Sequence, residues 1–132
     1  MLRALKSERA FVVHGADGLD ELSTTGINRV SELKDGQVTT YKLDPQELGL
    51  VKVSLNDLLG GTLEENAKIT RKILNGEGGP KRDIVLLNAA AILVAGGKAS
   101  DLKEGLDVAA ESIDNGTALK KIDELAKLSQ SF

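Results

Sequence analysis

The sequence predicts an α/β fold that holds only a partial sheet, with a central strand, a β-hairpin and about four C-terminal helices. Ala10 to Val13 is a short apolar run with β-branched residues, which is typical of a strand covered on both faces. Asp35-Gly36 lies between two stretches of β-formers and suits a two-residue hairpin turn. From residue 54 onward the apolar residues recur with a helical period.

Strands are expected in residues 9–54. Gly15 ends the first strand, and the hairpin strands are expected over residues 29–34 and 37–43. Their poor alternation and high charge favour a position at the edge or on the surface of the sheet. A further short strand is expected over residues 50–53.

Helices are expected in residues 55–132. Thr62 and Glu65 form a capping box at the start of the first helix, and Gly76 ends it. Pro80 suits the first turn of the second helix, whose sequence is apolar nearly all round. We therefore expect this second helix to be buried in the middle of the fold.

The last two helices have their own start and stop signals. Asp101 with Glu104 opens the third helix, and Asn115-Gly116 closes it. Thr117 is expected to cap the fourth, whose inward residues would be Leu119, Ile122, Leu125 and Ala126. Because no linker or repeat separates these elements, residues 1–132 are interpreted as one domain fragment.

The order of the elements indicates that the fragment belongs to something larger. Strands and helices normally alternate along a complete α/β domain, whereas here strands gather near the start and helices near the end. One central strand and a hairpin cannot cover so apolar a helix on all sides. We expect the rest to come from a longer protein, from a homo-oligomer or from a partner chain.

Composition excludes several classes of function. Of 132 residues, 41% are hydrophobic and 28% charged, which is the balance of a globular protein. The aromatic residues are only Phe11, Tyr41 and Phe132, and the net charge is -3, so we expect no nucleic-acid partner. The absence of cysteine and of any signal or membrane-spanning stretch predicts a soluble, cytoplasmic protein without a membrane partner.

The segment VVHGADGLDE, residues 12–21, places acidic residues directly behind the first strand. Loops at the carboxyl ends of strands line the crevice where α/β sheets bind ligands. Asp20 and Glu21 suit Mg²⁺, which proteins usually hold with one or two carboxylates, waters and substrate phosphates. From the residues alone, an acidic turn with Asp17 in an Asx turn and Asp20 as a helix cap is the alternative.

VVHGADGLDELS resembles the VHG-x-DGLDE segment of the anthranilate phosphoribosyltransferase family. The likeness continues in the family's order through RVSELKDGQV, LDPQELGL, GGTLEENA, ILNGEGGPKRDIVLLNAAA and AGGKASDLKEG. The resemblance implies the C-terminal portion of a larger phosphoribosyltransferase domain. Such enzymes transfer phosphoribosyl from phosphoribosyl pyrophosphate to anthranilate in tryptophan biosynthesis, with Mg²⁺. By this likeness Asp20 and Glu21 help to hold the Mg²⁺, and Asp17 holds the turn.

The resemblance also shows what is missing. Family members are much longer, and the part that precedes Met1 carries the glycine loop for the diphosphate and the residues that bind anthranilate. We therefore expect the isolated chain to be inactive, and we assign it no catalytic or substrate-binding residue. His14, Asn66 and Asn88 are assigned structural roles, the two asparagines by joining helices. The alternatives are a non-catalytic module that completes or regulates a partner chain, and a piece of a related nucleoside phosphorylase.

Overall fold

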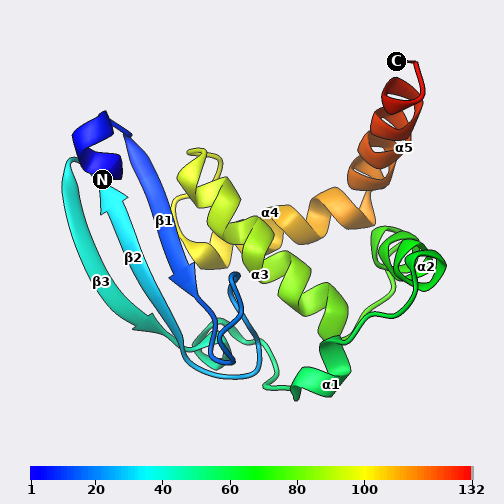
Figure 1. Ribbon diagram of the computed structural model, residues 1–132, viewed down its shortest axis with the longest axis horizontal. Coiled ribbons are helices and arrows are strands. Elements are labelled where there is room, and N and C mark those ends of the chain that lie inside the picture. The colour runs from blue at the N-terminus through cyan, green and yellow to red at the C-terminus, as the bar shows by residue number, and fades with distance from the viewer. Residues whose placement is uncertain (132) are drawn as a thin grey trace.

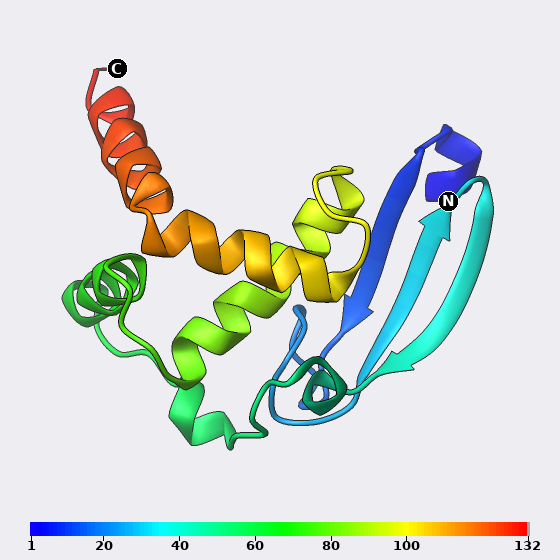
Figure 2. The same cartoon turned by 180° about the vertical axis from the view of Figure 1, so that it is seen from behind.

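The computed structural model describes residues 1–131 and confirms the α/β class (Figure 1). A three-stranded antiparallel sheet lies to one side of a group of helices, and Figure 2 shows the same arrangement from behind. The elements, in chain order, are the 3₁₀ turn η1 (Leu2–Leu5), the strands β1 (Arg9–His14), β2 (Asn28–Lys34) and β3 (Gln37–Leu43), the 3₁₀ turn η2 (Pro45–Leu48), and the helices α1 (Leu55–Leu58), α2 (Leu63–Leu74), α3 (Pro80–Ala95), α4 (Leu102–Asp114) and α5 (Thr117–Ser129).

The order of strands corrects the predicted central strand. The sheet runs β1-β2-β3, so β2 is the middle strand and β1, which contains Ala10 to Val13, lies at one edge. The apolar run shows that both faces of the strand are apolar. It does not show how many strands are hydrogen-bonded to it. Within this chain β1 is not covered on both faces, because Val12 is 58% exposed.

The predicted hairpin is confirmed within one residue at its start. Asp35 and Gly36 both have positive φ, 49° and 74°, as a type I′ turn requires. Lys34 and Gln37 are therefore direct cross-strand partners. The expectation that the hairpin lies at an edge holds for β3 but is wrong for β2, whose Val30 and Leu33 are buried.

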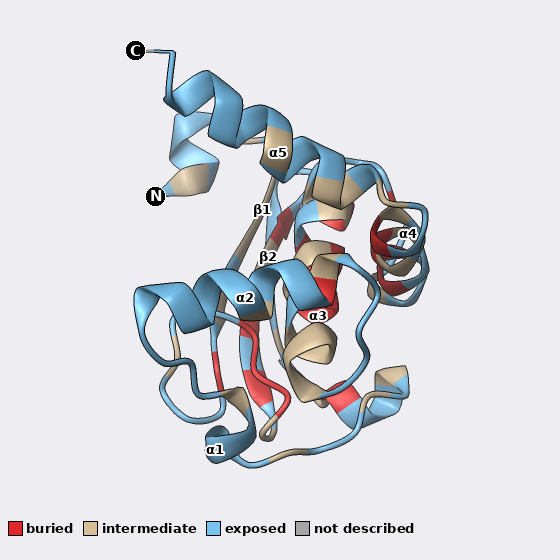
Figure 3. Ribbon diagram, turned by 90° about the vertical axis from the view of Figure 1, so that its right-hand side faces the viewer, coloured by how far each residue is buried: buried red, intermediate tan, exposed pale blue. Residues whose placement is uncertain are grey.

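The core consists of two apolar clusters that share helix α3. The first, between α3 and the sheet, contains Leu22, Val30, Leu43, Leu87 and Ala91. The second, between α3 and the helices α2 and α4, contains Ile73, Leu86, Ala90, Leu106, Ala109 and Ile113. Figure 3 shows these buried residues along α3, α4 and β2. The predicted central position of α3 is confirmed, although its Ile92 is 73% exposed.

Most predicted helix ends are confirmed because they depend on contacts within one turn. Thr62 and Glu65 form the capping box of α2, and the Asp101 side chain accepts a hydrogen bond of 2.9 Å from the Glu104 backbone N–H. Pro80 is the first residue of α3. The strand expected over residues 50–53 is absent from the described sheet, because η2 turns the chain away from the strands.

Helix α5 differs from its prediction at its start and along its apolar stripe. Gly116 precedes the helix and adopts the left-handed conformation, with φ 79°. The cap comes from Asn115 and not from the side chain of Thr117, because the Asn115 side-chain oxygen accepts from the Thr117 N–H at 2.9 Å. Ile122 and Leu125 were expected to point inward but are 37% and 60% exposed, because α5 extends away from the other helices (Figure 1). None of the helices in residues 1–131 is long and apolar enough to cross a membrane.

Acidification should destabilise the start of α4. The hydroxyl and then the backbone N–H of Ser100 donate to Glu104 and hold the pKa of this carboxyl below its usual value. A lowered pKa in the folded state stabilises the fold above the unfolded-state pKa, and this contribution is lost as pH falls through the folded-state value. We expect Glu104→Gln to weaken the fold at neutral pH and to reduce the further loss of stability on acidification.

Thermal unfolding between neutral pH and about pH 3 measures this effect. Glu111→Gln is the matched control, since Glu111 lies on the same helix and its carboxylate accepts no hydrogen bond within the described chain. Identical pH profiles for the two variants would contradict the assignment.

Candidate functional site

The acidic loop, defined as residues 15–21, folds back on itself directly after β1. The Gly15 N–H donates to the Leu19 carbonyl at 2.9 Å, and the Gly18 N–H donates to the Gly15 carbonyl at 3.0 Å. A Cβ at Gly15 would lie 2.6 Å from the backbone oxygen of Glu21, so only glycine fits there. The turn brings the end of the loop back against its beginning and leaves Asp20 and Glu21 exposed.

Asn88 of α3 holds the residue that follows the acidic loop. Its side-chain oxygen accepts from the Leu22 N–H at 2.9 Å, and its amide donates to the Leu22 carbonyl at 2.8 Å. The same amide donates to the Ile84 carbonyl at 3.0 Å. Leu22 itself is buried in the cluster between α3 and the sheet. Helix α3 therefore fixes the chain immediately behind the two exposed carboxylates.

A second asparagine, Asn28 at the start of β2, organises the segment between the acidic loop and the sheet. Its side chain accepts from the Ser23 N–H at 2.7 Å and donates to the carbonyls of Ser23 and Gly26, at 2.9 and 3.2 Å. Asn28 and Ser23 are fully buried, so water cannot replace these bonds. The buried hydrogen bonds of Asn28 therefore fix the backbone of this segment, although it is neither a helix nor a strand.

Asp17 belongs to this support and not to the exposed pair. Its carboxylate accepts from the Ser23 hydroxyl at 3.3 Å and from the Thr25 hydroxyl. The two hydroxyls also bond to each other at 2.8 Å. The predicted role of Asp17, which was to hold the turn, is confirmed.

Asp20 and Glu21 are adjacent and exposed, and their carboxylates are free to bind a ligand. Neither carboxylate makes a hydrogen bond or ion pair to any residue within 1–131. The described residues also contain no group of three or more side chains arranged to hold a metal ion. The site therefore offers two free carboxylate groups, those of Asp20 and Glu21. This fits a Mg²⁺ that keeps several waters and relies on a substrate's phosphates, and it does not fit a cation caged by protein alone.

The remaining polar candidates have structural positions. His14 is exposed at the end of β1 opposite Arg29, with no hydrogen bond of its side chain in the described structure. Asn66 bonds to the N–H and carbonyl of Gly61, at 2.8 and 3.2 Å. The prediction that Asn66 and Asn88 join helices to one another is wrong. Each side chain instead binds the backbone of a loop, at Gly61 and at Leu22. In the sequence, a single amide on an apolar helix indicates that Asn88 has a hydrogen-bond partner. The sequence does not indicate that this partner is Leu22.

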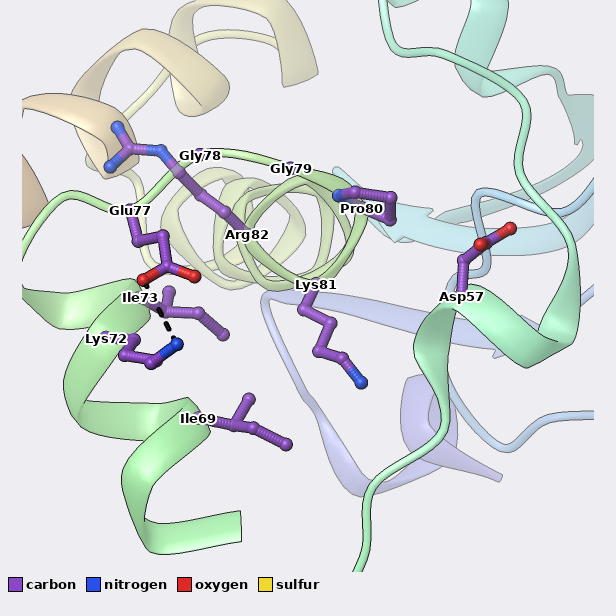
Figure 4. A pocket seen from close by; sticks show the side chains of 10 residues that line it. All are labelled: Asp57, Ile69, Lys72, Ile73, Glu77, Gly78, Gly79, Pro80, Lys81 and Arg82. Carbon is purple, nitrogen blue, oxygen red and sulfur yellow. Dashed lines mark ion pairs between the residues drawn. The ribbon is translucent and has the colours of Figure 1, made fainter. Parts of the chain in front are cut away.

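A separate cavity of about 280 Å³ lies between α2 and the start of α3 (Figure 4). Its cationic side chains are already engaged: Lys72 pairs with Glu77 at 3.6 Å, and Lys81 donates to a backbone carbonyl after α1. Arg82 points away from the cavity and pairs with Asp114 at 2.8 Å. The acidic loop does not line this cavity. It is therefore not an extension of the carboxylate site.

Comparisons with known proteins agree on one family. A model described as "Glycosyl transferase family, a/b domain" matches residues 1–119. The anthranilate phosphoribosyltransferase of Acetivibrio thermocellus is 50% identical over 132 residues, which is 100% of this chain and 38% of that protein. The enzyme of the same name from Azorhizobium caulinodans is 44% identical, again over 100% of this chain and 38% of that protein.

Solved structures show the same likeness. Anthranilate phosphoribosyltransferase from Thermus thermophilus matches 88% of this chain and 34% of its own, with 44% identity and a TM-score of 0.79. The Saccharomyces cerevisiae enzyme in complex with PRPP and Mg matches 92% of this chain and 35% of its own, with 30% identity and a TM-score of 0.81.

The chain spans about 38% of the length of the curated relatives it matches, so its fold is part of a larger domain. The resemblance to anthranilate phosphoribosyltransferases, inferred from the acidic loop and the segments that follow it, is confirmed over the whole chain. The chain belongs to the glycosyl transferase family described by the a/b-domain model.

Proposed function

We propose that this chain is the C-terminal part of an anthranilate phosphoribosyltransferase. The complete enzyme would transfer the phosphoribosyl group of phosphoribosyl pyrophosphate to anthranilate in tryptophan biosynthesis. The observation that carries the proposal is 50% identity over every residue of the chain to a protein of that name. Related yeast structures are described with PRPP and Mg and with 4-fluoroanthranilate, which supports these substrate classes and this metal.

Asp20 and Glu21 would contribute the protein's ligands to Mg²⁺. The bound metal would supply positive charge where negative charge develops on the leaving pyrophosphate. The chain's own task is to hold the two carboxylates in place. The Gly15 turn and the hydrogen bonds between Asn88 and Leu22 do so from opposite ends of the acidic loop.

The isolated chain would lack the rest of the machinery. Gly60 and Gly61 precede α2, but they follow α1 and not a strand, and the side chain of Asn66 binds the N–H of Gly61. These glycines therefore do not form a phosphate-binding loop between a strand and a helix. Two carboxylates alone cannot orient donor and acceptor, and orientation supplies much of the rate of such a transfer.

Replacing both carboxylates tests the proposal in a complete enzyme, made by joining this chain to the part of the Acetivibrio thermocellus protein that precedes the matched stretch. We expect Asp20→Asn with Glu21→Gln to lower kcat/KM for phosphoribosyl pyrophosphate by more than about 100-fold, because even residues that merely support metal ligands cost 10–100-fold. The Mg²⁺ concentration needed for half-maximal rate should rise in parallel.

The matched control is Asp35→Asn with Glu47→Gln, a pair of acids that are also exposed and lie outside the acidic loop. This control should keep both the rate and the Mg²⁺ dependence. Unchanged turnover and Mg²⁺ dependence in the Asp20 and Glu21 variant would show that the metal is held elsewhere. An inactive joined enzyme with its native sequence, despite correct folding, would count against the proposed reaction itself.

A further inference from the structure

Three basic side chains form a row across one end of the sheet. His14 of β1 is the cross-strand partner of Arg29 of β2, and Arg29 is the partner of Lys42 of β3. Direct partners in antiparallel strands lie on the same face, with Cβ atoms about 4.5–5.5 Å apart. All three side chains are exposed. We call these three residues the basic row.

The basic row has no acidic neighbour on its face of the sheet. Val30 packs toward α3, so Arg29, the residue before it, points to the opposite face. Glu32 is the only acidic residue in the three strands, and it lies on the α3 side, where it pairs with Arg9 at 3.1 Å. Neither Arg29 nor Lys42 takes part in an ion pair within residues 1–131. Like charges directly opposite one another destabilise a sheet, and nothing in the described chain offsets this cost.

The basic row lies beside the acidic loop. His14 is the last residue of β1, and the acidic loop begins at the next residue. The hydrogen bond from the Gly15 N–H to the Leu19 carbonyl, 2.9 Å long, returns the loop to the end of β1 just before Asp20. In Figure 1, β1 and β3 end, and β2 begins, at this same end of the sheet. Two free carboxylates and two free cations therefore share one end of the sheet.

An open hollow gives an anion access to the basic row. The hollow has a volume of about 470 Å³ and lies against Arg29, Thr40 and Lys42, and no aspartate or glutamate lines it. Guanidinium and ammonium groups are the side-chain donors that proteins most often use to bind phosphate oxygens. The hollow therefore fits a phosphate group.

We propose that Arg29 and Lys42 attract the phosphate groups of phosphoribosyl pyrophosphate to the neighbouring carboxylates of Asp20 and Glu21. A polyphosphate bound to a metal is positive at the metal and negative at its outer oxygens, so it is complementary to a pair of acids beside a pair of bases. Charges near a site raise the rate at which a charged substrate arrives by about 10- to 1,000-fold, without touching the reacting atoms. This inference rests on the proposed function for the identity of the substrate, but not for the attraction of phosphate.

Inorganic pyrophosphate is the first probe, because it tests the attraction without the reaction. It is added to the isolated, ¹⁵N-labelled chain at low salt and without Mg²⁺, so that no metal links it to the carboxylates. We expect the amide signals of Arg29, Thr40 and Lys42 to shift. Arg29→Gln with Lys42→Gln should weaken this binding by at least about 10-fold, because charge-assisted hydrogen bonds to both cations are lost. Both side chains are exposed, so the variant should fold as the native chain does.

The matched control is Lys34→Gln with Lys103→Gln, which removes the same net charge from two other exposed residues. Lys34 lies at the far end of β2, about 17 Å from Arg29, which exceeds the screening length of about 8 Å at physiological ionic strength. This control should bind pyrophosphate as tightly as the native chain. Equal losses in the two double variants would overturn the proposal, because net charge and not the basic row would then set the affinity.

The joined enzyme tests the role of the basic row in the reaction. We expect Arg29→Gln with Lys42→Gln to raise KM for phosphoribosyl pyrophosphate by about 10-fold and to leave kcat unchanged, since the attraction precedes the chemical step. The difference from the control should fall below about 2-fold near 1 M salt, where the screening length is about 3 Å. An unchanged KM, or the same rise at every salt concentration, would overturn the proposal. A joined enzyme that binds pyrophosphate through the basic row but transfers no phosphoribosyl group would support the row and contradict the proposed function.

Discussion

Replacing Asn88 by leucine is expected to lower the free energy of unfolding by about 2–4 kcal/mol, because two buried backbone groups lose their partner. The Asn88 amide binds both the N–H and the carbonyl of Leu22, at 2.9 and 2.8 Å. Leu22 is 1% exposed, so water cannot reach these groups once the amide is removed. Leucine has the same branched shape as asparagine, with two methyl groups in place of the amide oxygen and nitrogen, so it leaves no cavity. The loss would therefore report hydrogen bonding and not packing.

Asn66→Leu is the matched control, since Asn66 makes the same pair of bonds to Gly61. Both residues are exposed, and water can replace the lost bonds, so we expect a change of less than about 1 kcal/mol. Denaturant unfolding of both variants, with the amide exchange rate of Leu22, measures the difference. Equal losses at the two sites would show that burial does not set the cost.

On the proposal that Asp20 and Glu21 hold the Mg²⁺, the same substitution should also weaken metal binding in the joined enzyme. Asp20 and Glu21 directly precede the residue that Asn88 holds, so a looser Leu22 would spread the positions of both carboxylates. Residues that orient metal ligands typically contribute 10–100-fold to metal affinity or activity, and we expect a rise of about this size in the Mg²⁺ concentration for half-maximal rate. A destabilised enzyme with unchanged Mg²⁺ dependence would mean that Asn88 supports the fold alone.

Features that depend on a few consecutive residues could be predicted from the sequence. The Asp35-Gly36 turn requires two left-handed residues, and that pair is favoured in few other settings. The caps at Thr62 and Asp101 close within a single turn of helix. The sequence also predicts that the acidic loop is a site, because Asp20 and Glu21 follow an apolar strand and match the family segment, and the role of this pair stays a prediction.

Features that depend on distant partners could not be predicted in the same way. The β1 pattern reports apolar surroundings, but only the fold shows that β2 lies on one side of β1 and no described strand on the other. Asn88 contacts a residue 66 positions away, and no local rule identifies such a partner. The apolar stripe of α5 predicted burial, yet Leu125 is 60% exposed within this chain. An amphipathic pattern shows that one face of a helix is apolar and needs a covering partner. That partner can lie in another part of the protein.

Gly105 illustrates a contact that sequence marks only faintly, as a glycine inside a helix where it costs about 1 kcal/mol relative to alanine. The structure supplies the reason for it. A Cβ on Gly105 of α4 would lie 2.9 Å from both Cα and Cβ of Ala90 on α3, and 3.0 Å from its carbonyl oxygen. Backbone atoms cannot move aside as a flexible side chain can. Any larger residue must therefore push α3 and α4 apart and open the cluster that contains Leu106 and Ile113.

Gly105→Val is consequently expected to lower the free energy of unfolding by about 2–3 kcal/mol, which is the upper part of the range for overpacked cores. Valine has a better helix propensity than glycine, but this offsets only a few tenths of a kcal/mol. Gly78→Val is the control, because a Cβ on Gly78 meets nothing within 4 Å and its φ is not positive. That change should stay within about 0.5 kcal/mol, as exposed substitutions usually do. Denaturant midpoints give both values. A Gly105 variant as stable as the Gly78 variant would mean that the two helices can separate freely, and that close approach at Ala90 does not hold the helical half together.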